Sequence, residues 1–586
     1  MPSTPITLPV AEWTPDMPAF QGGSQNMRNV LPRTPTSYGP LSNIQTYSGP
    51  LMRRCQGAFA CLDALGNVSV FTGDAKDLYR LTGGTTGWST VSGGSSPYNS
   101  PADQLWLFVL FGQRVLATEI NDPIQSYLLG TSATFSDLAY GGITALQLTQ
   151  GGGYTPGSYT LTPTNTGGGS GFAGTVTVGV DGKLDSFAIS APGRLYGSGT
   201  TMPVPAGAGP GTGGAVVPVI AAVAPKARYA AIVRNFLVAA NTNDPANGAQ
   251  PQRVWWSALN DPTNWPTPGT AAAAQVQSDY NDLLGSGGWI QGIVGNLGTA
   301  DGAVFMERAV WRMVYAGPPA VFYFFAAEGV RGTPSPGSIV QIGPLVYYLG
   351  RDGFYVFDGT TSRPIGVNKV DKYFYATVDQ NNMARVVGTF DPINKLVIWA
   401  WPDTSATNGN PNHLLIYNWQ LDRWSIADVT LEHLTTLLSF GYTLDSMNPL
   451  GTLDSMPQLP LDSRAWTGGK DILAAFDTSH QLNYFTGQNL AATIDLGEQQ
   501  PFPGCRAQVK NARPLVDGGT PSVAVGTRNR LVDSVSFNSA TAMNSLGACP
   551  QRANGRYVRG EITIPAGTNW THCQGLELEA TPAGIR

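Results

Sequence analysis

Residues 114–123 read RVLATEINDP, and residues 236–245 repeat the pattern as FLVAANTNDP. Each copy is a short apolar run followed by Asn-Asp-Pro, the composition of a strand that ends in a turn. The copies lie 122 residues apart, but 84 of the residues between them, 141–224, differ in composition, and removing these leaves a period of 38. A four-stranded β-propeller blade has a period of roughly 40 residues. The repeated stretch, which we call the echo, therefore predicts a propeller that carries an insertion.

Turn signals continue along the rest of the chain. Asp-Gly pairs flank the aromatic run 354–357, and Asp-Gly between apolar runs indicates a hairpin because such turns need positive φ. Together with the two echoed Asp-Pro pairs, these residues are the candidate blade turns: Asp122, Pro123, Asp244, Pro245, Asp352, Gly353, Asp358 and Gly359.

Composition divides the chain into five parts. The first fifty residues contain Pro every few positions, and residues 141–224 contain 21 Gly. Alternating apolar residues and an Asp-Gly turn within the Gly-rich part indicate an ordered β module that projects from a propeller loop. We therefore expect an all-β chain with an extended N-terminal arm at 1–50, first propeller blades at 51–140, an inserted Gly-rich β module at 141–224, remaining blades at 225–490 and a C-terminal β segment at 491–586. Five to eight blades fit these boundaries.

The amino-acid composition and the net charge exclude some classes of protein. Hydrophobic residues make up 42% of the chain and aromatic residues 10%, which excludes a disordered protein. Charged residues are only 12%, and the net charge is −5. A nucleic-acid reader needs clustered Lys and Arg, so this class is disfavoured, whereas a channel through which DNA slides without sticking is not. No apolar run approaches the roughly 20 residues of a membrane helix, so we expect no membrane span.

The sequence contains no convincing motif for catalysis, cofactor binding or metal binding. The histidines lie too far apart for a local metal site, and the two G-x-G-x-x-G matches lack the strand and helix that a dinucleotide fold requires. We therefore predict no catalytic, cofactor-binding or metal-ligating residues, no cofactor and no enzymatic activity. One alternative stays open: a carboxylate pair such as Asp279 and Asp282 could serve a glycosidase if the two groups were suitably spaced.

Several segments resemble tail proteins of short-tailed bacteriophages. They include residues 111–118 (FGQRVLAT), 254–265 (VWWSALNDPTNW) and 353–359 (GFYVFDG), with 28–40 and 557–575 as further similar stretches. The sequence is most similar to the tail nozzle family, also called tail tubular protein B or packaged-DNA stabilisation protein. The resemblance covers most of residues 25–500, and its motifs are structural. The insertion at 141–224 departs from the family pattern, which leaves open whether it decorates a tube or contacts fibres.

The resemblance implies a structural virion protein in the phage tail, assembled in the host cytoplasm. It would form a hexameric ring or tube below the adaptor, retain packaged double-stranded DNA and conduct it during ejection. The implied partners are adaptor or connector proteins and tail fibres or spikes. The candidate contacts to the adaptor or a neighbouring subunit are Arg28, Asn29, Arg33 and Tyr38. The alternatives are a receptor-binding fibre or spike component and a propeller glycan depolymerase.

Overall fold

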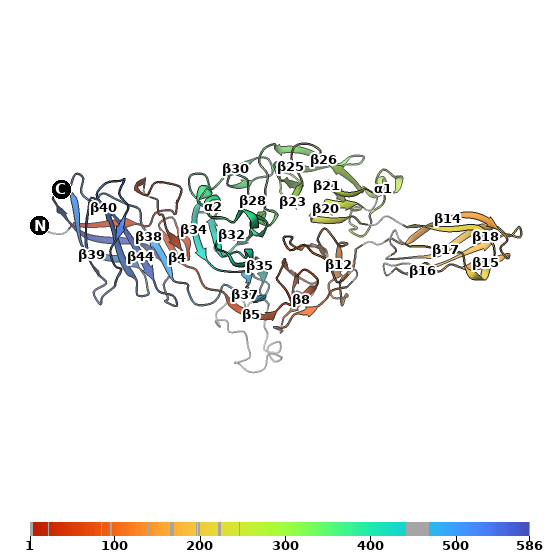
Figure 1. Cartoon of the computed structure of the whole chain (residues 1–586), viewed down its shortest axis with the longest axis horizontal. Coiled ribbons are helices and arrows are strands. Elements are labelled where there is room, and N and C mark those ends of the chain that lie inside the picture. The colour runs from red at the N-terminus through yellow and green to blue at the C-terminus, as the bar shows by residue number, and fades with distance from the viewer. Residues whose placement is uncertain are drawn as a thin grey trace.

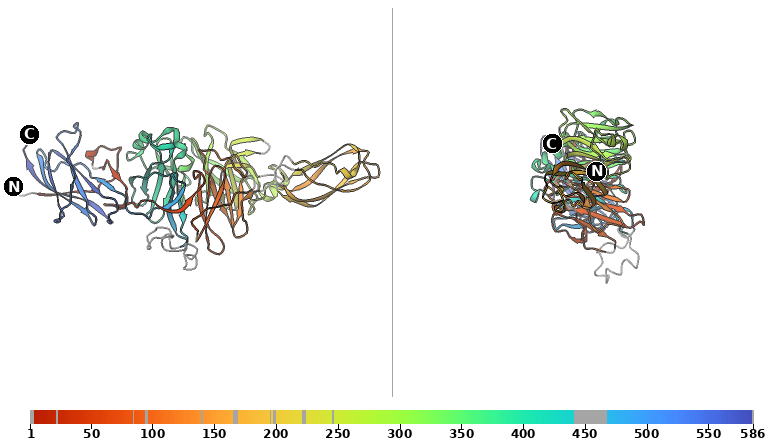
Figure 2. Two further views of the ribbon diagram at one scale, coloured as in Figure 1. Left: turned by 60° about the horizontal axis from the view of Figure 1, so that its bottom comes forward. Right: turned by 90° about the vertical axis from the view of Figure 1, so that its right-hand side faces the viewer.

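A computed structural model of the chain has three parts along its longest axis (Figure 1). The C-terminal domain, with both chain ends, lies at one end, a ring of blades lies in the middle, and the inserted module lies at the other end. A second direction of view gives the same order (Figure 2). The structure describes residues 4–584 except 22, 84, 94–95, 139–140, 165–168, 195, 197–199, 221–223, 245–246 and 441–467.

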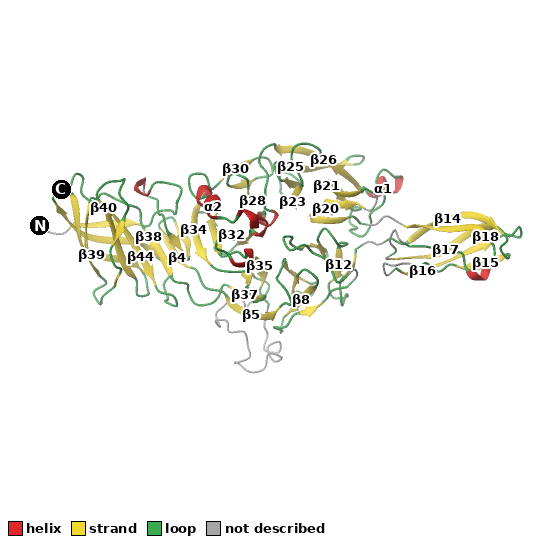
Figure 3. Ribbon diagram, in the orientation of Figure 1, coloured by secondary structure: helices red, strands yellow, loops and turns green. Residues whose placement is uncertain are grey.

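Strands dominate the described residues (Figure 3). The two α-helices found in the described residues are short, α1 (Ala271–Val276) and α2 (Asp371–Thr377). Short 3-10 helices occur in loops as η1 (Ala19–Gln21), η2 (Ala206–Ala208), η3 (Pro336–Ser338), η4 (Gln380–Arg385) and η5 (Thr407–Gly409). The predicted fold class, an all-β propeller with an inserted β module and a C-terminal β domain, is confirmed.

Among the described residues, seven four-stranded blades form the propeller: six are separate sheets and one is part of a ten-stranded sheet. Blade one contains β6 (Ala58–Leu62), β7 (Val68–Gly73), β8 (Leu78–Thr82) and β9 (Ser89–Thr90). Blade two contains β10 (Leu107–Phe111), β11 (Arg114–Thr118), β12 (Gln125–Leu128) and β13 (Ser136–Asp137). Blade three contains β19 (Lys226–Val233), β20 (Phe236–Asp244), β21 (Gly248–Trp256) and β22 (Asp279–Asp282). Blade four contains β23 (Ile290–Gly295), β24 (Gly302–Met306), β25 (Val310–Gly317) and β26 (Val321–Glu328).

The last three blades follow the same antiparallel order. Blade five contains β27 (Val340–Ile342), β28 (Leu345–Leu349), β29 (Phe354–Phe357) and β30 (Ser362–Pro364). Blade six contains β31 (Val387–Asp391), β32 (Leu396–Trp401), β33 (His413–Asn418) and β34 (Arg423–Asp428). Blade seven contains β35 (His433–Leu438), β36 (Asp471–Phe476), β37 (Gln481–Tyr484) and, from the N-terminal part of the chain, β5 (Gln45–Pro50).

Strands in the interior of a blade, such as β32, are apolar on both faces because neighbouring blades cover both. In β32 every residue is buried. Val397 and Trp399 pack into one core, and Leu396 and Ile398 pack into another on the opposite side. Since successive strand residues point to opposite faces, a strand between two blades reads as a continuous apolar run. First strands of neighbouring blades contact one another, namely β6 with β10, β10 with β19, β19 with β23, β27 with β31, β31 with β35 and β35 with β6.

The C-terminal domain is a β-sandwich that shares a sheet with the propeller. One sheet contains β1 (Thr4–Pro9), β3 (Val30–Thr34), β4 (Ser37–Pro40), β45 (Cys573–Ala583), β39 (Arg506–Val516) and β43 (Cys549–Gly555). The other contains β38 (Ala492–Asp495), β44 (Tyr557–Ile564), β40 (Ser522–Arg528), β41 (Ser536–Phe537) and β42 (Thr541–Ala542). Strand β2 (Met27–Arg28) pairs with β34 of blade six and with β38, so one ten-stranded sheet runs from the propeller into the sandwich.

The inserted module follows the last strand of blade two and precedes β19. It has two small sheets and its own apolar core, which includes Ile143, Val176 and Leu184. The strands are β14 (Ile143–Gly152) paired with β18 (Thr212–Ile220), and β15 (Gly157–Thr160), β16 (Ser170–Val178) and β17 (Leu184–Arg194).

The prediction of an extended N-terminal arm at 1–50 is corrected. The described residues of this segment form β1 to β5, which pair within the chain: β1 with β45, β2 with β34 and β38, and β5 with β37. Proline hid these strands from the sequence pattern. It lacks an N–H but fits edge strands, where one side needs no partner, and within the described part of the chain β1 and β5 each pair on one side only.

Candidate functional site

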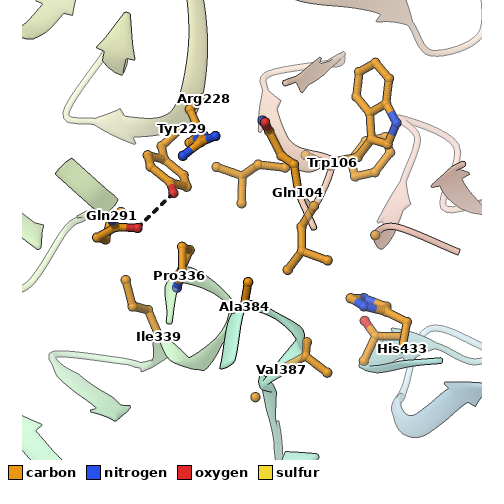
Figure 4. A pocket seen from close by; sticks show the side chains of 18 of the residues that line it. Gln104, Trp106, Arg228, Tyr229, Gln291, Pro336, Ile339, Ala384, Val387 and His433 are labelled. Carbon is orange, nitrogen blue, oxygen red and sulfur yellow. Dashed lines mark hydrogen bonds between the residues drawn. The ribbon is translucent and has the colours of Figure 1, made fainter. Parts of the chain in front are cut away.

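A cavity of about 500 Å³ lies where the first strands of the blades converge (Figure 4). Each of the seven blades contributes residues at or near the start of its first strand, including Phe59, Phe108, Tyr229, Gln291, Gln341, Thr389 and Thr435. This volume lies within the range of small-molecule sites, roughly 300–1,000 Å³. We call this space the axial cavity.

Gln104 is a notable polar group of the axial cavity. Its side chain is 6% exposed, and neither its Oε1 nor its Nε2 has a hydrogen-bond partner among the described residues. The loop that carries it is held by Gln56, whose Nε2 donates to the backbone oxygen of Gln104 at 2.9 Å. The position of the residue is therefore fixed, while its amide is left for another partner.

Arg228 and Tyr229 enter the cavity from the start of β19 (Figure 4). The Nε of Arg228 is buried and has no hydrogen-bond partner among the described residues. The Tyr229 hydroxyl donates to Oε1 of Gln291 at 3.5 Å, a long contact. Burial raises the pKa of Tyr229, so the phenol stays protonated at neutral pH and remains a donor.

His433 lines the opposite side of the cavity from the start of β35 (Figure 4). Burial, with a smaller effect of the nearby Arg54, lowers the pKa of its imidazole to about 3. The ring is therefore neutral at physiological pH and can donate at one nitrogen and accept at the other. Asp103 also lines the cavity and pairs with Arg385 at 3.3 Å.

The echoed Asp-Pro pairs lie at equivalent places in adjacent blades. Asp122 and Pro123 lie between β11 and β12, and Asp244 ends β20 just before β21, so both sites join the second strand of a blade to the third. Oδ2 of Asp122 accepts from the backbone N–H of Asn99 at 2.6 Å. Pro245 lies outside the described residues.

The two predicted Asp-Gly turns lie in blade five. Asp352 and Gly353 join β28 to β29, and Oδ1 and Oδ2 of Asp352 each accept from the Tyr355 hydroxyl at 2.9 Å. Asp358 and Gly359 join β29 to β30. Backbone hydrogen bonds, the largest from Thr361, lower the pKa of Asp358. Gly359 has a φ of +89°, a backbone conformation that glycine adopts without steric cost, which explains why glycine occupies this position.

The four predicted neighbour contacts make bonds inside the chain. Nη1 of Arg28 lies 2.6 Å from Oδ1 of Asp428 in β34, and Asn29 donates to the backbone oxygen of Ala491 at 2.8 Å. Nη1 of Arg33 donates to Oδ1 of Asn394 at 2.6 Å. Contacts of these three side chains with another protein stay a prediction.

For Tyr38 the expectation of a neighbour contact is wrong. Its side chain is fully buried in the core shared by the sandwich and blade six. The hydroxyl donates to the backbone oxygen of Trp424 at 3.0 Å. The aromatic ring packs there because β3 and β4 lie against the C-terminal domain instead of forming a free arm.

The two carboxylates considered for glycosidase chemistry, Asp279 and Asp282, accept hydrogen bonds from different partners. Asp282 accepts two hydrogen bonds from Arg253, at 2.7 and 2.8 Å. Oδ1 of Asp279 accepts from the N–H of Tyr280 at 2.9 Å. The two carboxylates are three residues apart on one strand, and side chains at that spacing point to opposite faces.

The described residues contain neither a grouped set of metal ligands nor a helix suited to a membrane. There, no three His, Cys, Asp or Glu side chains are grouped so that they could hold a metal ion. No helix in the described part of the chain is long and apolar enough to cross a membrane.

Sequence reasoning missed the axial cavity. Its polar groups, Gln104, Arg228, Gln291 and His433, come from different blades and share no motif. The available signal was positional: each lies at or just before the start of a blade's first strand, and first strands surround the axis of a propeller.

No protein-family model and no curated protein sequence matches the chain. Among solved structures, a putative 6-phosphogluconolactonase from Bacteroides uniformis is 12% identical with a TM-score of 0.25, covering 67% of this chain and 98% of that chain. A Penicillium chrysogenum alpha-L-arabinanase is 9% identical with a TM-score of 0.19, covering 67% and 98%. An ancestral GH74 enzyme is 11% identical with a TM-score of 0.20, covering 80% and 76%.

These neighbours contradict one expectation. The sequence predicted a protein without enzymatic activity, but the similar solved structures include proteins named as enzymes, so that exclusion does not stand. At these identities and TM-scores, the likeness transfers no substrate, residue role or reaction to this chain.

Proposed function

We propose that this chain is the subunit of the tail nozzle of a short-tailed bacteriophage. In this role it forms a ring or tube below the adaptor, retains the packaged genome and conducts it during ejection. The ten-stranded sheet that joins blade six to the C-terminal sandwich is the observation that carries the proposal. A tube that contains DNA under pressure needs subunits that do not bend between their domains, and a shared sheet supplies that rigidity.

The N-terminal segment strengthens this connection. Strand β1 belongs to the sandwich, whereas β5 completes blade seven. Between them, the Arg28 and Asp428 side chains form an ion pair where β2 meets β34. Separating the propeller from the sandwich would therefore require breaking backbone hydrogen bonds of β2 as well as side-chain contacts.

An aromatic surface on blade four suits contact between subunits. Tyr323 and Phe325 are 54% and 49% exposed on β26, the outer strand of the blade. Aromatic residues are enriched in protein interfaces, and an exposed outer strand favours association. A ring closes when one such surface meets a different surface of the next subunit.

The charge balance is compatible with DNA passage. Only 12% of residues are charged and the net charge is −5. Binding to DNA strengthens with each phosphate that Lys or Arg neutralises, so a conduit with few cations lets the duplex slide. The inserted module lies at the end of the molecule opposite the termini (Figure 1), where it can contact fibres or spikes.

Cryo-electron microscopy of particles that carry a tagged copy of this chain tests the proposal. We expect the tag on an axial tube below the adaptor, and mass photometry of the purified protein or its tail complex should give six copies per ring. A peripheral appendage, a trimer, or a chain that stays monomeric in the assembled particle would contradict the nozzle assignment.

A further inference from the structure

The axial cavity contains polar groups that a role in a tail tube does not use. The amide of Gln104 is more than nine-tenths buried, and both of its polar atoms lack a partner among the described residues. Leaving a buried polar group unsatisfied destabilises a fold, and such groups are rare in native proteins. A buried amide that faces a cavity therefore indicates a ligand that supplies the missing hydrogen bonds.

Arg228 adds a positive charge to the same cavity. Two other arginines are paired with carboxylates: Arg253 with Asp244 and Asp282, and Arg528 with Glu498. Nε of Arg312 and Nη1 of Arg423 lack a hydrogen-bond partner among the described residues, as does Nε of Arg228, but neither Arg312 nor Arg423 lines the axial cavity. No carboxylate within salt-bridge distance of Arg228 is found in the described part of the chain, and its Nε is also unpartnered. In Figure 4 the polar ends of Arg228 and Gln104 point toward one another. A planar guanidinium in this position fits a carboxylate through two parallel hydrogen bonds.

The rest of the lining restricts the shape and polarity of the ligand. Ile339 and Val387 supply apolar surface, whereas Tyr229, Gln291 and the neutral ring of His433 supply donors and acceptors (Figure 4). Small-molecule sites combine apolar walls with a few placed polar groups in this way. The donors and acceptors on several walls fit a molecule with hydroxyl groups pointing in several directions.

We propose that the axial cavity binds a small carboxylate that also carries hydroxyl groups, the chemistry of a sugar acid. Arg228 holds the carboxylate. Gln104 donates to and accepts from the ligand at the same end of the cavity, and Tyr229 with Gln291 holds a hydroxyl group on the neighbouring wall. All of the residues named for this site belong to one chain, so the site can be tested on the purified, unassembled protein.

Isothermal titration calorimetry of the purified full-length protein with D-glucuronate tests the site. We expect saturable binding of one ligand per chain with a dissociation constant of about 1 mM or tighter, as suits a ligand of this size. D-Glucose, which has the same ring without the carboxylate, should bind at least about tenfold more weakly, the discrimination expected when a buried charge loses its partner.

Two substitutions, each with a matched control, test whether Arg228 and Gln104 contact the ligand. Arg228→Met and Gln104→Leu should each weaken glucuronate binding by about tenfold or more, the factor that corresponds to one lost charged or buried hydrogen bond. Arg228→Met should also abolish the preference for glucuronate over glucose. The exposed Arg552→Met and Gln420→Leu change the same residue types away from the cavity and should leave binding unchanged.

Thermal unfolding separates a ligand contact from a structural role. Gln104→Leu removes two unsatisfied polar atoms, so the ligand-free variant should unfold at the same or a higher temperature than the wild type while binding is lost. The proposal is overturned if the wild type shows no saturable glucuronate binding, if glucose binds equally well, if both cavity variants bind normally, or if Gln104→Leu lowers the unfolding temperature.

Discussion

Nη1 of Arg253 lies 2.7 Å from the carboxylate of Asp244, and the two side chains are only 5% and 4% exposed. The same guanidinium binds Asp282 through Nε and Nη2 and lies 3.8 Å from the ring centre of Tyr280. Asp244 belongs to the second copy of the echo. Its buried ion pair with Arg253 therefore holds the β20–β21 hairpin of blade three together.

Replacing Arg253 should destabilise blade three strongly. Arg253→Met takes the guanidinium away from two carboxylates, and removing one partner of a buried pair costs about 3–5 kcal/mol. Urea unfolding of the purified protein measures this loss. Adding Asp244→Asn and Asp282→Asn to Arg253→Met should restore most of the stability, since no buried charge then remains. An unchanged midpoint for the single variant would show that the ion pair contributes little.

Gly359 should tolerate alanine less well than Gly343 in the same blade. Both have positive φ, +89° and +57°, which costs alanine roughly 1–2 kcal/mol. A Cβ at Gly359 would overlap Oγ1 of Thr299, whereas a Cβ at Gly343 meets nothing within 4 Å. Gly359→Ala should therefore cost about 1–3 kcal/mol more than Gly343→Ala. Equal unfolding midpoints for the two variants would contradict the predicted contact.

Asp371 should make the protein less stable as pH rises. Burial, with smaller effects of Asp16 and Asp352, raises the pKa of this carboxyl to about 7 from an ordinary value of 3.8. Between these values the folded state keeps a proton that the unfolded state has lost, so stability falls from about pH 4 to pH 7, and the full penalty applies above pH 7.

Asp371→Asn tests this pH dependence. The variant should match the wild type near pH 4 and unfold at a higher temperature than the wild type near pH 8, because the amide carries no charge to bury. The exposed Asp185→Asn is the matched control and should not change the slope. Parallel curves of unfolding temperature against pH for wild type and Asp371→Asn would contradict the assignment.

Ring assembly should depend on the aromatic surface of blade four, if the nozzle proposal is correct. The double variant Tyr323→Ser and Phe325→Ser removes two half-exposed rings and should shift the mass distribution from six copies to smaller species. The fold should remain stable because both rings lie at the surface. Leu65→Ser with Val532→Ser removes exposed apolar side chains elsewhere and serves as control. Intact rings from the blade-four variant would exclude this surface as the contact.

The blade pattern could be predicted because it is local. An apolar strand such as β20 alternates between two covered faces, and the turn after it needs Asn, Asp or Gly within a few residues. The insertion was recognisable because its glycine content breaks that pattern. The N-terminal strands could not be assigned in the same way, because Gln45 pairs with Tyr484 and Thr4 with Ala580, partners that lie hundreds of residues away.

The sequence by itself determined an all-β chain, the blade period and the place of the insertion, because strand alternation and turn chemistry act between near neighbours. Only the tertiary structure decided the number of blades, the burial of Tyr38 and the axial cavity. Gln104, Arg228, Gln291 and His433 meet because ring closure brings the starts of separate strands to one axis. Such closure depends on packing between blades, which no single stretch of residues records.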